Sequence, residues 1–126
     1  MKKDWTRDYV TEMFRLYAKM GAAEYDRLRA LPVGDDERDT PYAQDIIAAG
    51  KTLEMLHHND KTLVERAVRA VYCVCPLRPI RRGEISERIN RFAIDNAVDH
   101  ATIYRWLRAA RDIAASERGL RISGKK

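Results

Sequence analysis

Apolar residues recur along this chain at helical spacing, and the alternation that is typical of strands is scarce. An acidic or hydroxyl residue, Asp4 or Thr6, is available to cap the first amphipathic helix. Its apolar positions are Trp5, Tyr9, Met13, Leu16, Tyr17 and Met20. We expect a bend at Gly21, a further helical stretch over residues 22–31 that ends at Pro32, and an exposed acidic loop over residues 33–40.

Thr40 followed by Pro41 is a strong start signal, because Thr caps helices and Pro is tolerated at the first helical position. The helix that begins there places Tyr42, Ile46, Leu53 and Leu56 on one face. Residues 61–74 form another helix, in which two rows of apolar residues repeat at a spacing of four. The rows are Leu63, Ala67 and Val71, and Val64, Val68 and Tyr72. This wide apolar stripe predicts a central helix.

Pro76 and Pro79 end that helix, because proline cannot continue it, and residues 76–83 form a short basic connector. We take the connector as the start of a second unit. The pattern predicts an all-α fold, with a helical module over residues 1–75 followed by a helix-turn-helix over residues 76–126.

The segment from Asp99 to Arg111 reads as a recognition helix. Asp99 can accept the free amide protons of its first turn, and Gly119 ends the last helix. The spacing predicts an inward face made of Ile103, Trp106, Leu107, Ala110, Ile113 and Ala114. We expect this face to pack on a supporting helix, whose own inward residues are Ile85, Ile89 and Phe92. The outward face carries groups suited to base edges and phosphates: His100, Ala101, Thr102, Tyr104, Arg105 and Arg108.

Further cations are expected at the phosphates of both DNA strands. They are Arg81, Arg82, Arg88, Arg91 and Arg111, the last on the same broad side of its helix as Arg105 and Arg108. The alternative is local pairing of Arg108 with Asp112 and of Arg88 with Glu84, at a spacing of four. Trp106 fits the core better than a stacked base. Tyr104 fits either the edge of the core or a phosphate, and His100 either a DNA contact or an ordinary surface position.

Charge divides unevenly along the chain. Residues 1–75 hold 12 Lys and Arg against 13 Asp and Glu, a net charge of −1, while residues 76–126 hold 12 against 6, a net charge of +6. The basic half suits a polyanion such as double-stranded DNA, although a solvated surface rich in Arg would give the same balance.

The segment VDHATIYRWLRAAR, residues 98–111, resembles the recognition helix in region four of sigma factors and in related phage and recombinase domains. With the upstream helices and the chain length, the whole resembles the small phage-encoded late-transcription regulators of the RinA/ArpU type. The resemblance implies promoter binding, contact with RNA polymerase and control of packaging or structural genes. It places His100, Ala101, Thr102 and Arg105 at groove-facing positions, and Ile103 and Leu107 at packing positions.

One feature departs from that pattern. A tight turn between two such helices usually contains Gly, but the segment RFAIDNAVD, residues 91–99, has none. Either the supporting helix runs on through Ile94, or the turn is a looser loop.

Other chemistry finds little support in the sequence. Adjacent His57 and His58 point to different sides of a helix, and the acidic cluster in residues 35–39 lacks the spacing of a calcium loop. Cys73 and Cys75 are expected to be reduced and mostly buried. We expect no metal, no cofactor, no enzymatic activity, no membrane segment and a cytoplasmic location.

Three functions follow as hypotheses. The first is a sequence-specific DNA-binding transcription regulator, with the helical module serving self-association or polymerase contact. The second is a phage small terminase subunit that recognises a packaging site and forms a ring. The third is a helical protein-binding adaptor that uses the stripe from Leu63 to Tyr72 and the first helix.

Overall fold

The computed structural model describes residues 4–120, and these form six helices and no strand. In chain order the helices are α1 (Trp5–Met20), α2 (Ala22–Arg29), α3 (Pro41–His58), α4 (Thr62–Tyr72), α5 (Glu84–Asn96) and α6 (His100–Arg118). The predicted all-α fold is confirmed. No helix in this part of the chain is both long and apolar enough to cross a bilayer.

Helices α1, α3 and α6 begin at side-chain caps, and α1 and α6 end at glycines, as the sequence predicts. Asp4 Oδ1 accepts from the Arg7 amide at 2.9 Å, Thr40 Oγ1 from the Ala43 amide at 3.2 Å, and Asp99 Oδ2 from the Ala101 amide at 3.0 Å. Gly21 and Gly119 follow α1 and α6 with φ of 89° and 80°, values that disfavour any side chain.

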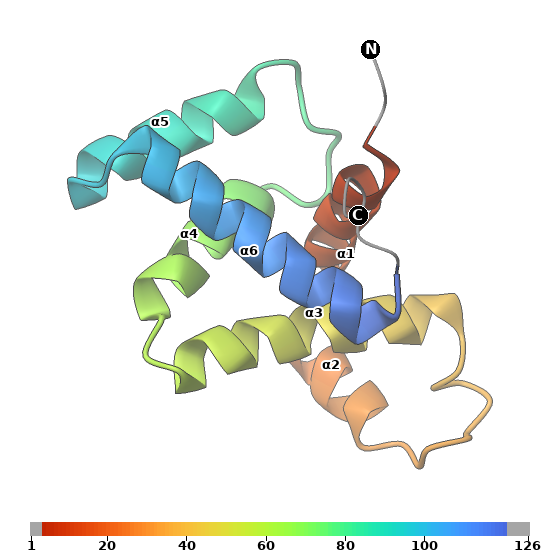
Figure 1. The fold of residues 1–126 in the computed structure, drawn as a ribbon. Helices are drawn as coiled ribbons and strands as arrows, with labels where there is room; N and C mark the ends of the chain where they lie inside the picture. Colours follow the sequence, from red (N-terminus) through yellow and green to blue (C-terminus); the bar gives the residue numbers. More distant parts are fainter. Residues whose placement is uncertain (1–3, 121–126) are drawn as a thin grey trace.

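Helix α6 lies across the middle of the molecule and packs against α1, α3, α4 and α5 (Figure 1). Its buried residues Ile103, Leu107, Ala110 and Ala114 join one hydrophobic core with those of the amino-terminal helices. The predicted inward face of α6 is therefore confirmed, and residues from both sides of the expected boundary at residue 76 share this core.

The apolar stripe on α4 packs against other helices of the same chain. Ala67, Val68, Val71 and Tyr72 are buried, and Leu63 and Val64 are partly buried against the same core. The stripe is consequently unavailable to a partner helix, which removes one of the two features that suggested an adaptor.

Four positions expected on apolar faces are exposed instead. Trp5 is 73% exposed, Tyr9 41%, Met20 39% and Tyr42 36%. Helix α1 turns Val10 and Phe14 inward, and the two tyrosines direct their hydroxyls to carboxylates. Tyr9 donates to Asp45, which also accepts from Arg118 at 2.7 Å. That pair of bonds ties α1 and the end of α6 to α3.

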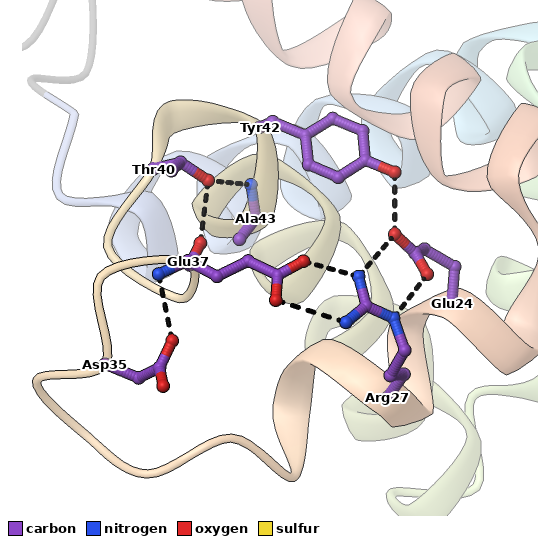
Figure 2. A network of polar contacts seen from close by, with 7 residues as sticks. All are labelled: Glu24, Arg27, Asp35, Glu37, Thr40, Tyr42 and Ala43. Carbon is purple, nitrogen blue, oxygen red and sulfur yellow. Dashed lines mark hydrogen bonds and ion pairs between the residues drawn. The ribbon is translucent and has the colours of Figure 1, made fainter.

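The acidic loop before α3 is exposed, as expected, but it is held by a network of polar contacts (Figure 2). Arg27 on α2 bonds both Glu24 and Glu37, and Tyr42 donates to Glu24 at 2.8 Å. The Arg27 guanidinium lowers the pKa of both carboxyls. Within the loop, the Glu37 amide donates to Asp35 Oδ1.

Candidate nucleic-acid interface

The junction of α5 and α6 resolves the two alternatives left by the sequence. Helix α5 runs on through Ile94 to Asn96, and only Ala97, Val98 and Asp99 separate it from α6. Ala97 adopts the left-handed conformation, with φ 53° and ψ 46°, and the Val98 amide donates to the Ala93 carbonyl at 3.0 Å. Alanine thus takes the conformation for which glycine is preferred, and the turn is tight.

The amino-terminal half of α6 presents an open face. Ala101, Tyr104, Arg105 and Arg108 are exposed and lie at spacings of three, four and seven, which places them on one side of the helix. We call these four residues the α6 strip. Thr102 is half-buried beside it, and its hydroxyl oxygen accepts from Arg105 Nη2 at 3.1 Å. Trp106 is partly buried against the core, the role preferred for it.

His100 is exposed, but its ring is engaged by the preceding helix. Its Nε2 lies 2.6 Å from Oδ1 of Asn90 on α5. This hydrogen bond ties the start of α6 to the exposed side of α5 and fixes the direction of the imidazole. Asn90 was not singled out by the sequence analysis, although it follows Glu87 and Ser86 at helical spacing on the polar side of α5.

Arg111 departs from the expected surface. It is half-buried and donates from Nη1 to the Tyr72 hydroxyl at 2.8 Å, so its guanidinium lies between α6 and α4. The expectation that Arg111 shares an outward side with Arg105 and Arg108 is therefore wrong. The three residues from Arg108 to Arg111 advance the helix by about 300°, about 60° short of a full turn, so this position is displaced from the outward side.

Phosphate contact is also expected for Arg88, but its side chain is engaged within the protein. Its side chain is only 11% exposed and donates to Glu84 Oε2 at 2.6 Å and to the Val71 carbonyl at 2.7 Å. The alternative of local pairing with Glu84 is the one observed. Arg108 and Asp112, the other expected pair, form no ion pair in the described part of the chain.

Glu84 accepts hydrogen bonds from the connector as well as from α5. It accepts from the Arg78 guanidinium and from the Arg81 amide, in addition to Arg88. These donors, with Arg78 the largest influence, hold the pKa of the Glu84 carboxyl far below its ordinary value. The carboxylate fixes the connector against the first turn of α5.

The remaining predicted cations are exposed. Arg81 and Arg82 end the connector directly before α5, and Arg91 lies two turns along that helix. None of the three side chains has a hydrogen-bond or ion-pair partner among residues 4–120. Together with Arg105 and Arg108 they give five exposed guanidiniums on α5, α6 and the connector that pair with no carboxylate among the described residues.

The connector itself is fixed by a residue that the sequence analysis missed. Arg15 on α1 is 8% exposed; its guanidinium pairs with Glu12 at 3.2 Å and donates to the carbonyl of Arg78. A buried arginine that bonds a backbone carbonyl 63 residues away has no signal in local spacing. It joins the amino-terminal helices to the segment that carries Arg81 and Arg82.

The described residues give little support for a metal site or a reactive thiol. No cluster of three His, Cys, Asp or Glu side chains able to hold a metal lies within the described residues, and His57 bonds Glu65 at 3.1 Å. Cys73 and Cys75 are free, but Cys75 is exposed, so the expectation of two mostly buried thiols is wrong for it. Burial raises the pKa of the Cys73 thiol to about 11.

Comparisons with protein-family models, with curated proteins and with solved structures found no match to this chain.

Proposed function

We propose that this chain is a sequence-specific DNA-binding transcription regulator of the cytoplasm, without enzymatic activity, which reads double-stranded DNA with the α6 strip. The observation that carries the proposal is the strip itself, an exposed helix face with a small residue and two arginines that pair with no carboxylate in residues 4–120. An arginine can bond guanine in a bidentate manner, and a small residue lets the helix approach the base edges.

The turn and the supporting helix favour the same function. Helices α4, α5 and α6 all pack on one another, and α5 meets α6 through a three-residue turn, the arrangement of a helix-turn-helix. In that motif the second helix enters the major groove and the first crosses the backbone. Arg81 and Arg82 at the start of α5, and Arg91 on its exposed side, then suit phosphates.

The likeness to phage late-transcription regulators supplies the biological part of the proposal. Under it the chain binds near a promoter, with RNA polymerase contact or self-association through the amino-terminal helices. A small terminase subunit would share the DNA-binding unit but assemble into a ring, which native mass spectrometry distinguishes.

The test begins with selection of bound duplexes from a random pool, followed by titration of the selected duplex. Arg105→Ala and Arg108→Ala are each expected to weaken binding by about 1–3 kcal/mol if they contact bases, and the cost should fall on particular positions of the site. Arg27→Ala is the matched control, because its guanidinium is already paired with two carboxylates.

Unchanged binding of both α6 variants would contradict the assignment of α6 as the reader. Absence of any salt-sensitive binding by the unmodified chain would overturn the proposal of DNA binding altogether.

A further inference from the structure

A groove of about 470 Å³ opens beside the α6 strip, between α1, the connector, α5 and α6. One part of its lining is apolar and consists of Ile80, Ile85, Ile89 and Leu107 beside the rings of Tyr72 and Tyr104, and α1 and α6 add the polar side chains Arg7, Asp8, Thr11, Glu12 and Arg111. The volume falls in the range of small-molecule sites, which combine an apolar lining with few polar groups. The apolar part of the lining would exclude water around the apolar body of a ligand of modest size.

The charges on the groove are unequally matched. On the α1 side, Asp8 lies 3.6 Å from Arg7, and Glu12 lies 3.2 Å from Arg15, so each carboxylate has a cation of its own. On the α6 side, Arg111 forms no ion pair with any described residue. Among the charged residues that line the groove, Arg7, Asp8, Glu12 and Arg111, it is therefore Arg111 that has no ion-pair partner within the described residues.

The guanidinium of Arg111 is held in place by a hydrogen bond to a buried tyrosine. Nη1 donates to the hydroxyl of Tyr72, which is itself buried in the core at 3% exposure. A guanidinium has five N–H donors in a planar fork, and this bond uses one of them. A half-buried cation that forms no ion pair is unfavourable beside apolar side chains, and a carboxylate would relieve it by charge-assisted hydrogen bonds.

We propose that this groove binds a small monocarboxylic acid with an apolar body, whose carboxylate bonds Arg111 and whose body lies on Ile80, Ile85 and Leu107. Charge complementarity sets the sign of the ligand, and the apolar part of the lining sets its other end. The groove shares Tyr104 with the α6 strip, but the inference does not depend on DNA binding, because its test measures a small ligand bound by the chain without DNA.

The test uses octanoate as the probe and octylamine as its counterpart of opposite charge, titrated into the isotope-labelled full chain and followed by amide NMR shifts. Octanoate is expected to cause saturable shifts at Ile85, Ile89 and Leu107. Because one charge-assisted contact is lost, octylamine should bind about tenfold more weakly or worse.

Arg111→Gln should weaken octanoate binding about tenfold, whereas Arg108→Gln, with the same charge change on the same helix outside the groove, should leave it within about twofold. Arg111→Lys keeps the cation and should recover much of the loss, which guards against a variant that merely disturbs the fold. The proposal is overturned by absence of saturable shifts at the groove, by octylamine binding as tightly as octanoate, or by equal affinities of the two Gln variants. It is likewise overturned if Arg111→Lys binds no better than Arg111→Gln.

Discussion

Three arginines on α2 and α4 are neutralised by carboxylates, although Arg38 and Arg66 in the same region bond only carbonyl or amide oxygens, whereas five arginines around α5 and α6 have no such partner within the described residues. Arg27 pairs with Glu24 and Glu37, Arg29 with Glu54, and Arg69 with Glu65. Arg81, Arg82, Arg91, Arg105 and Arg108 have no such partner among the described residues. Composition shows the excess charge of the carboxy-terminal half, but only pairing shows which cations remain available to a polyanion.

The line between the two sets does not follow the sequence. Arg78 and Arg88 lie in the basic half, yet both bond Glu84 and belong with the paired cations. Their side chains are at most 37% exposed, and their bonds join the connector, α4 and α5. The basic half therefore contains a structural subset, which should respond to substitution through stability rather than through DNA affinity.

The largest effect should come from Glu84→Gln, which removes the carboxylate shared by Arg78, Arg88 and the Arg81 amide. We expect a greater fall in the thermal unfolding midpoint at pH 7 than for any single arginine replacement, because a poorly exposed guanidinium loses its counter-charge. Calorimetry or circular dichroism measures this midpoint.

The same variant should change the acid sensitivity of the fold. The pKa of Glu84 in the folded chain lies below its ordinary value of 4.5, so the carboxylate stabilises the fold above pH 4.5 and loses this contribution as the pH falls. The unmodified chain should therefore lose more stability than Glu84→Gln between pH 5 and pH 2. If the acid-unfolding curves of the unmodified chain and of Glu84→Gln are parallel, the charge of Glu84 does not stabilise the fold.

A smaller loss is expected for Arg88→Gln, which deletes bonds to Glu84 and to the Val71 carbonyl. We expect about 1–3 kcal/mol in the free energy of unfolding, as for hydrogen bonds of charged groups. Denaturant titration measures it, and the salt dependence of DNA binding by the folded variant should stay unchanged. A variant that keeps full stability but loses one phosphate contact would place Arg88 among the available cations.

The smallest effect on stability should come from Arg91→Gln, three residues further along α5. Its side chain is exposed and unpartnered within the described chain, so unfolding should change by no more than about 0.5 kcal/mol. The slope of log affinity against log salt should fall by about 0.9, the value for one phosphate. Equal changes of stability and of salt dependence in the Arg88 and Arg91 variants would contradict the distinction between paired and unpaired arginines.

The sequence predicts the parts of the fold that local chemistry determines. The caps Asp4, Thr40 and Asp99 and the stops Gly21 and Gly119 act within a few residues, so their roles follow from neighbours in the chain. The inward face of α6 follows from its spacing for the same reason.

Contacts between distant segments account for most of what the sequence did not predict. Arg111 meets Tyr72 across 39 residues, and no local pattern indicates that bond. Gly50 is buried on α3, where an added Cβ would lie 2.3 Å from Cε1 of Tyr25; only the packed helices show why glycine stands there. Ala97 stands at a left-handed turn position where glycine is usual, and the turn's backbone amides donate to carbonyls at the end of α5.

The most direct test of the account compares two triple variants that remove the same charge. One is Arg81→Gln, Arg82→Gln and Arg91→Gln; the other is Arg27→Gln, Arg29→Gln and Arg69→Gln, in which every arginine is paired. For the selected duplex, the slope of log affinity against log salt should fall by about 2.7 in the first, at about 0.9 for each phosphate, and stay unchanged in the second. Equal slopes in the two variants would contradict the claim that pairing decides which arginines meet DNA.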